Sequence, residues 1–254
     1  MCVERQQGNR RAFSILDVLV TMTVIGVLIG LLLPSLSMVQ ETARRVVCQS
    51  NVRQIGLGLV LYADDHQGRL PPSVFMQLAG PGRADPEPQH MLTLRLDPAR
   101  AESATSWDGM GILFDGDYLR APRVFFCPSH TGENRYSTLA NVWADPSQEL
   151  LANYHFRGAG PTGGGNPGDV RGLTFDLYRI DPAQSSLLAD GMRIKSDYNH
   201  KVGVNFFRAD LTVHWYSDPT GSLDSHMARN KDEAQPEDVN DAWVLFDLSA
   251  NAPN

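Results

Sequence analysis

The stretch that most constrains this chain runs from Ala12 to Val39 and is almost entirely apolar. From Val18 to Leu33 it carries no charge, and its weakest helix formers are Gly26 and Gly30. A run of this length matches what a helix needs to cross a bilayer core of about 30 Å. A cleaved signal peptide would have a shorter apolar core and a small-residue cleavage site after it. The stretch therefore predicts a membrane-spanning helix, and an ordinary signal anchor remains open. A buried core helix is the third alternative, which the length of the apolar run disfavours.

One acidic residue, Asp17, lies near the start of this apolar run, and the basic pair Arg10 and Arg11 stands immediately before the run. A carboxylate in lipid is costly, so it requires a partner. The alternative is a solvated position at the level of the lipid headgroups, near the helix end. The pattern favours a paired Asp17 and keeps the solvated position as the second hypothesis.

The order of these features resembles the N-terminal signal of type IV pilins and type II secretion pseudopilins. In that family a prepilin peptidase cleaves on the cytoplasmic side of the membrane and methylates the new N-terminus, which here implies processing between Ala12 and Phe13. Pro34 matches a proline that is common in the helix of this family. The family usually has Gly before the cleavage site and Glu at the acidic position, whereas this chain has Ala12 and Asp17.

The resemblance implies that Asp17 and the helix around Pro34 serve assembly. Leader removal would create a free amine in the apolar zone, and the acid of one subunit could neutralise the amine of its neighbour. Such a buried pair sets register more than it stabilises. The implied partners are the inner membrane, prepilin peptidase and other pilin-like subunits, in a type II secretion pseudopilus or a type IV pilus-like fibre. The implied location is a single-pass inner membrane protein with a cytoplasmic N-terminus and a periplasmic head.

After the apolar run, buried-type residues recur at steps of three and four, as on one face of an amphipathic helix. They are Cys48, Val52, Ile55, Leu59 and Tyr62. Pro34 is expected to kink the helix without ending it, and Gly68 followed by Pro71-Pro72 is expected to end it. The predicted division is a leader at 1–12, a long helix at 13–67 that spans the membrane to about residue 33, and a head at 68–254.

The head is predicted to be α+β: the long kinked N-terminal helix packs on a small antiparallel sheet, as in pilins. Alternation and β-branched or aromatic residues predict the strands, and the acidic stretch 224–241 is expected to be a solvated loop. The predicted elements are a short helix near 91–96, a helical turn within 109–119, strands at 124–127, 154–157, 186–189, 202–207 and 211–215, a glycine-rich loop at 158–172, and a strand or helical turn at 242–248.

Four later motifs resemble an expanded set of prepilin-like proteins of planctomycete-type bacteria. They begin at Cys48 (CQSNVRQIGL), at Tyr62 (YADDHQGRLPP), at Val124 (VFFCPS) and at Asn199 (NHKVGVNFFRAD). The resemblance therefore reaches both ends of the chain and is weakest in the middle. It identifies a subfamily without stating a biochemical role.

Cys48 and Cys127 would remain after removal of a leader that contains Cys2. An oxidising compartment favours a disulfide between them, and the alternative is two buried free thiols. No C-x-x-C and no paired histidine accompanies either residue, so local spacing does not indicate zinc.

Charge and motif content argue against several function classes. A net charge of -7 without a run of Lys and Arg is unlike a nucleic-acid-binding protein. Ser129-His130 lacks the framing of a catalytic nucleophile, and no Gly-x-Ser-x-Gly is present, so no enzyme activity is predicted. Calcium in the 224–241 stretch is the alternative to no metal, but the expected Asp-x-Asp-x-Asp-Gly spacing is missing.

Two groups of polar residues contain side chains that could form a site. Asp64, Asp65 and His66 are expected to solvate or cap a helix end. Asp190 and Asp210, near His200 and His214, are expected to shape turns through bonds to their own backbone.

The predicted function is that of a pseudopilin-like structural subunit. The alternative is a membrane-tethered periplasmic module that binds a polysaccharide or an exported protein. Replacement of Asp17 by Ala separates the two, because only assembly depends on that acid.

Overall fold

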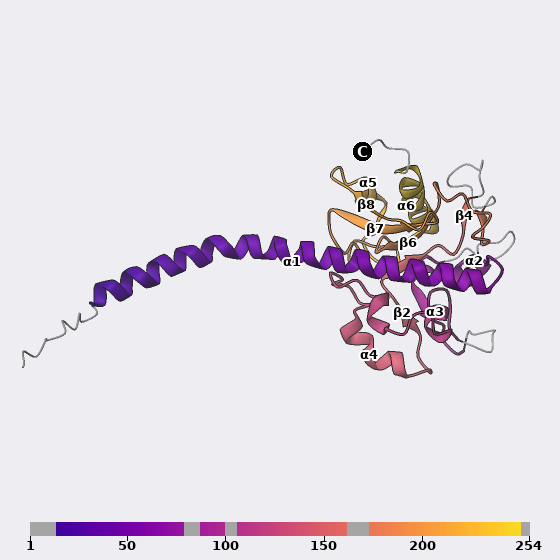
Figure 1. The fold of residues 1–254 in the computed structure, drawn as a ribbon, viewed down its shortest axis with the longest axis horizontal. Coiled ribbons are helices and arrows are strands. Elements are labelled where there is room, and N and C mark those ends of the chain that lie inside the picture. The colour runs from indigo at the N-terminus through magenta and orange to yellow at the C-terminus, as the bar shows by residue number, and fades with distance from the viewer. Residues whose placement is uncertain (1–13, 79–86, 100–105, 162–172, 250–254) are drawn as a thin grey trace, which may run out of the picture. The chain divides into compact units, whose positions relative to one another are not determined.

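The computed structural model describes residues 14–78, 87–99, 106–161 and 173–249 (Figure 1). The chain divides into two compact units, residues 1–42 and 43–254. Helix α1 (Ile15–Asp65) contributes its first part to one unit and its second part to the other. The two units are taken in turn.

The described part of the first unit is the N-terminal part of α1, whose apolar side chains are exposed. Its most apolar window of 18 residues has a mean hydropathy of 2.5, and none of that window is buried. By length and composition this helix can cross a membrane. The helix continues through Pro34, which confirms that this residue does not end it. The missing N–H of a proline removes one helical hydrogen bond without stopping the helix here.

The second unit contains residues 43–65 of α1, which bury the predicted stripe. Cys48, Val52, Ile55 and Leu59 are fully buried, and they form part of one core with residues of the sheet and of the smaller helices. The helix ends as predicted near Gly68: Gln67 and Gly68 have positive φ angles, and the Gly68 N–H donates to the Ala63 carbonyl at 2.8 Å. This six-to-one bond is the Schellman arrangement.

The main sheet of this unit has four antiparallel strands in the order β3-β6-β7-β8. Two-stranded antiparallel sheets, β1-β2 and β4-β5, accompany it. The central register pairs Ala189 with His155 on one side and with Phe206 on the other. The strands are β1 (Thr93–Arg95), β2 (Leu150–Leu151), β3 (Tyr154–Phe156), β4 (Gly160–Pro161), β5 (Leu173–Thr174), β6 (Ser186–Asp190), β7 (Gly203–Arg208) and β8 (Val213–Ser217). The α+β class with a long helix on small antiparallel sheets is confirmed.

Both faces of the main sheet are covered, and this makes its central strands continuously buried. Phe207 belongs to the core that contains the α1 stripe, whereas its neighbour Phe206 belongs to a second core with Trp243 and Phe246 of α6 (Pro236–Ser249). Figure 1 shows α6 and α1 on different sides of β6 and β7. The alternation of apolar residues in 202–207 and 211–215 is typical of half-buried strands. Half-burial holds for β8 alone, because β7 is covered on both faces.

Short helices complete the described chain. They are α2 (Val74–Leu78), η1 (Pro88–Leu92), α3 (Gly111–Asp115), η2 (Pro122–Phe125), α4 (Tyr136–Ala144) and α5 (Ser222–His226). The predicted strand at 124–127 is wrong, because Pro122 at its start sets a helical φ and a 3-10 turn forms. The predicted short helix near 91–96 is partly wrong: η1 ends at Leu92 and β1 follows.

The C-terminal helix α6 corrects the expectation of a solvated loop followed by a strand or a single helical turn. It begins at Pro236 with Glu237 and Asp238 in its first turn, which suits the positive end of a helix dipole. Its buried residues Val239, Ala242, Trp243 and Phe246 have helical spacing. That stripe starts inside the stretch whose acidic composition suggested a loop.

Candidate functional site

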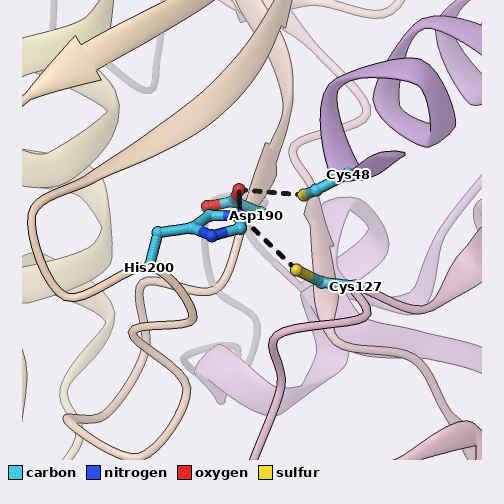
Figure 2. Close-up of side chains that lie close together, drawn as sticks. All are labelled: Cys48, Cys127, Asp190 and His200. Carbon is cyan, nitrogen blue, oxygen red and sulfur yellow. Dashed lines mark hydrogen bonds and ion pairs between the residues drawn. The ribbon is translucent and has the colours of Figure 1, made fainter. Parts of the chain in front are cut away.

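Four side chains with metal-ligating or nucleophilic atoms meet between α1 and the main sheet. They are Cys48, Cys127, Asp190 and His200, and one donor atom from each lies within 4.8 Å of all the others. The Cys48 Sγ is 3.1 Å from Asp190 Oδ2, and the His200 Nε2 is 3.3 Å from the same oxygen. The Cys127 Sγ is 3.5 Å from His200 Nε2. Figure 2 shows the four groups pointing toward one another from separate segments. We call this set the Cys-Asp-His cluster.

Each member is delivered by a different local structure. Cys48 belongs to the buried stripe of α1, and Cys127 follows η2, where its N–H donates to Asn153 Oδ1 at 2.6 Å. Asp190 is the last residue of β6. His200 lies in the turn before β7, next to Lys201, which has a φ of 63°. All four residues are buried, so the cluster is closed to solvent.

Asp190 is the hub of the cluster. Its Oδ2 accepts hydrogen bonds from Cys48 Sγ and from both the backbone N–H and the side-chain amide of Asn205, at 3.1 Å and 3.2 Å. Its Oδ1 has no hydrogen-bond partner among the described residues although the side chain is fully buried. The expectation that Asp190 shapes a turn is therefore wrong, because the carboxylate points into the core instead of back to its own backbone.

Burial and charge together set the protonation of the cluster. Burial raises the pKa of the Cys48 thiol well above its ordinary value, and Cys127 and Asp190 raise it further. Burial lowers the pKa of His200, but the hydrogen bonds and charges of Asp190 and Cys48 outweigh this and raise it to about 11. The raised pKa keeps Cys48 a neutral thiol among these four residues.

A second layer of side chains holds the cluster in place. The Tyr154 hydroxyl donates to Cys48 Sγ at 3.5 Å, and Asn51 donates to that hydroxyl at 3.4 Å. Burial raises the pKa of Tyr154 well above its ordinary value, so this hydroxyl stays a donor. The His200 ring meets the Trp215 ring edge-on, with centroids 5.8 Å apart.

Of the two sequence-based alternatives for the cysteines, the structure has the free thiols. Cys48 and Cys127 are both buried and unbonded to each other. The local spacing around the cysteines does not indicate which groups surround them. The fold brings a carboxylate and an imidazole close to both sulfurs. The separation of the four residues along the chain hides the grouping from any local motif.

The other residues singled out in the sequence lie elsewhere. Ala12 and Phe13 lie outside the described residues. Asp17 is exposed in the first turn of α1, where its Oδ2 accepts the Ser14 N–H at 3.1 Å. Pro34 lies inside the same helix.

The remaining polar candidates form hydrogen bonds at the end of a helix or within a turn. Asp64 and Asp65, at the end of α1, accept hydrogen bonds from the hydroxyls of Tyr178 and Tyr118 at 2.6 Å and 2.9 Å. Asp210 accepts the Thr212 N–H at 3.0 Å, which is the predicted turn role.

In the acidic stretch Asp224 pairs with Lys195 at 2.5 Å. Asp241 lies 3.8 Å from His226 in the same part of the chain.

A cavity of about 890 Å³ opens near the end of α1. Apolar groups dominate its wall and polar side chains border it. It is lined by Tyr62, Asp65, His66, Gln67, Arg69, Leu70, Pro71, Pro72, Ser73, Met76, Gln77, Gly158 and Phe175. His66 stacks on Tyr62 with ring centroids 3.8 Å apart, and Phe175 is 55% exposed. A cavity with aromatic walls and a polar border is suited to a ligand with both kinds of surface.

Comparison with known proteins places residues 38–193 in one family model. That model is described as a protein of unknown function (DUF1559). The match includes Cys48, Cys127 and Asp190 of the Cys-Asp-His cluster and ends before His200. No curated protein matches the chain, and no solved structure matches it.

Proposed function

Because this chain belongs to the DUF1559 family of unknown function, we propose a function from its own architecture: a pilin-like subunit that is anchored by its N-terminal helix and assembles through it. The subunit belongs to a type II secretion pseudopilus or a type IV pilus-like fibre. Its N-terminus faces the cytoplasm, its helix crosses the inner membrane, and its head lies in the periplasm.

One observation carries the proposal: the N-terminal part of α1 has no partner for its apolar side chains within the described chain. Leu31 is 73% exposed and Met22 is 70% exposed, and the whole apolar window is unburied. Burial of such surface is worth about 25 cal/mol per Å². Lipid and the equivalent helices of neighbouring subunits are the surroundings that supply it.

The acidic residue supports assembly over a plain anchor. Asp17 sits in the first turn of an apolar helix, where lipid alone offers it no charged partner. The hydrogen bond from the Ser14 N–H and the positive end of the helix stabilise part of the negative charge of Asp17. A free amine on the neighbouring subunit would neutralise that charge. Such an amine requires processing just before Phe13 by a prepilin peptidase.

The first test is the N-terminal sequence and mass of protein extracted from membranes. We expect the chain to start at N-methylated Phe13. A start at Met1 or Cys2 would contradict processing and leave a signal anchor. A start beyond Leu33 would mean a cleaved signal peptide and would overturn the anchored subunit.

The second test addresses assembly directly. Asp17→Ala should reduce cross-linked oligomers in membranes by at least about tenfold, because one partner of a buried charge pair is removed. Ser14→Ala is the matched control: it removes a hydroxyl that bonds the Leu16 N–H and leaves the backbone N–H that bonds Asp17. Equal oligomer yields from Asp17→Ala and the natural chain would contradict the pairing role.

The cavity near the end of α1 favours a second candidate, a membrane-tethered module that binds a polysaccharide or an exported protein. An exposed aromatic ring such as Phe175, beside Asp65 and Arg69, suits a sugar face with hydroxyl groups. Under this candidate Phe175→Ala abolishes ligand retention on membranes and Asp17→Ala leaves it unchanged. Under the assembly proposal Asp17→Ala reduces oligomer formation and Phe175→Ala leaves it unchanged.

A further inference from the structure

We propose that the Cys-Asp-His cluster is a structural zinc site, with Cys48 Sγ, Cys127 Sγ, His200 Nε2 and a carboxylate oxygen of Asp190 as its four ligands. This inference is independent of pilus-like assembly, since it concerns what holds the head to its own helix. It applies equally to a tethered binding module.

The spacing of the donor atoms fits a tetrahedral ion. With zinc bonds of about 2.3 Å to sulfur and about 2.0–2.1 Å to nitrogen and oxygen, tetrahedral ligands lie about 3.3–3.8 Å apart. The observed separations around Asp190 Oδ2 and His200 Nε2 are 3.1, 3.3 and 3.5 Å, and all four atoms lie within 4.8 Å of one another. The three shorter separations lie within about half an ångström of these values, and a pair at the 4.8 Å limit would have to close by about 1 Å.

The choice of metal follows from the donors. Two thiolates, one imidazole and one carboxylate in tetrahedral array select zinc among the common divalent ions, whereas calcium and magnesium require more oxygens. Four protein ligands leave no open position, and every ligand is buried. This is the pattern of a structural site, not of a catalytic one.

The surroundings of the cluster are arranged as in a metal site. Asn205 directs its backbone N–H and its side-chain amide at Asp190, and the Tyr154 hydroxyl donates to the sulfur of Cys48. Such outer donors orient the ligands and stabilise their negative charge. Asp190 Oδ1, fully buried and without a hydrogen-bond partner among the described residues, is the atom whose environment is left incomplete by protein groups alone.

Binding would be a ligand exchange without oxidation or reduction. Aqueous Zn²⁺ would exchange its water ligands for four protein bonds, and the released water and the protons on the two thiols and on Nε2 would leave to solvent. The ion would then join α1 to the end of β6, to the turn before β7 and to the segment after η2. These segments are far apart in sequence, so the site would stabilise the docking of the helix on the sheet.

The test is the metal content of the full chain, extracted in mild detergent and purified through a tag without histidines. We expect about one zinc ion per chain, and we expect Co²⁺ added to metal-stripped, reduced protein to show the charge-transfer and d–d absorption of tetrahedral thiolate coordination. A reduced chain that takes up neither Zn²⁺ nor Co²⁺ would overturn the proposal. So would recovery of a Cys48–Cys127 disulfide from freshly lysed cells.

Variants separate ligation from general damage. His200→Gln and Cys127→Ser should lose zinc, whereas His214→Gln, on β8 of the same sheet, should retain it. Asn205→Ala should weaken zinc affinity about 10–100-fold while its backbone N–H remains. Full zinc retention in His200→Gln would also overturn the assignment. Zinc measured on the unaltered chain keeps the test valid even if a variant fails to fold.

Discussion

The two parts of α1 are both helical and rich in apolar residues, yet they meet opposite surroundings. In residues 15–42 the apolar residues occupy every face and are exposed, whereas in residues 43–65 the head covers one stripe of them. Large apolar side chains off that stripe stay exposed in the second part, among them Val46, Val47, Leu57 and Leu61. Ile25 is 54% exposed and Ile55 is fully buried. The comparison teaches that the distribution of apolar residues around a helix decides its partner: a stripe finds a core in its own chain, and an all-round surface requires lipid or other subunits.

The largest expected change in the stability of the head comes from placing an aspartate in each of the two parts of α1. Ile55→Asp should destabilise the head by about 4–5 kcal/mol or unfold it, because it buries a carboxylate without a partner. All four tryptophans, at 107, 143, 215 and 243, lie in the second unit. Denaturant unfolding in detergent, followed by tryptophan fluorescence, therefore measures the head.

Ile25→Asp is the matched control for this experiment. It should leave tryptophan-monitored stability within about 0.5 kcal/mol of the natural chain. Its effect should appear in cells as loss from the membrane fraction, since an aspartate at the centre of a spanning helix costs about 3 kcal/mol. Equal destabilisation of the head by both variants would contradict the conclusion that the two parts of α1 have different surroundings.

A smaller change in the stability of the head is expected from pH. The responsible group is Asp108, which lies in the second unit, so this change tests the second unit alone. Burial raises the pKa of Asp108 from 3.8 to about 7, although its Oδ1 accepts the Val74 N–H at 2.8 Å. An acid whose pKa is higher in the folded state binds more protons there than in the unfolded state. Stability from this group therefore falls as pH rises between those two values.

Between about pH 5.5 and pH 7.5 this loss should be about 2 kcal/mol relative to Asp108→Asn, which cannot ionise. The measurement is denaturant unfolding of both chains at each pH in detergent. A constant difference between them across that range would show that Asp108 does not titrate as described.

The smallest expected effect uses glycines from the two parts. A Cβ on Gly56 would lie 2.4 Å from the buried ring of Phe207, so Gly56→Ala should cost about 1–2 kcal/mol after its gain in helix propensity. A Cβ on Gly26 meets nothing within 4 Å among the described atoms. Gly26→Ala should thus leave the head unchanged in the same assay. If it nevertheless reduces oligomer formation, a neighbouring helix approaches at that glycine; a loss of head stability would contradict the exposed environment.

Local pattern was a good guide wherever one segment contains its own signal. The exposed apolar helix follows from its length, and the stripe at Cys48, Ile55 and Tyr62 follows from its period. The strands near 154–156, 186–190 and 203–208 were predicted within one or two residues. The helix end near Gly68 follows from the residues that follow it.

Local pattern failed where the outcome depended on neighbours in space. The helix α6 was not predicted, because the acidic composition of its first turn is typical of a loop. The helix buries Val239 and Trp243 in a core that it shares with the sheet, and this contact is not visible in the local sequence. Asp190 looked like a turn residue, because its partners Cys48 and Asn205 become neighbours only when the helix packs on the sheet.

The sequence by itself determined a membrane-type helix, an amphipathic continuation and an antiparallel head, because each depends on residue types at fixed short intervals. Only the tertiary structure decided that Cys48, Cys127, Asp190 and His200 meet. The physical reason is that no short period links these positions. Packing of α1 against β6 and β7 brings them together, and the desolvation that results gives the four side chains their chemistry.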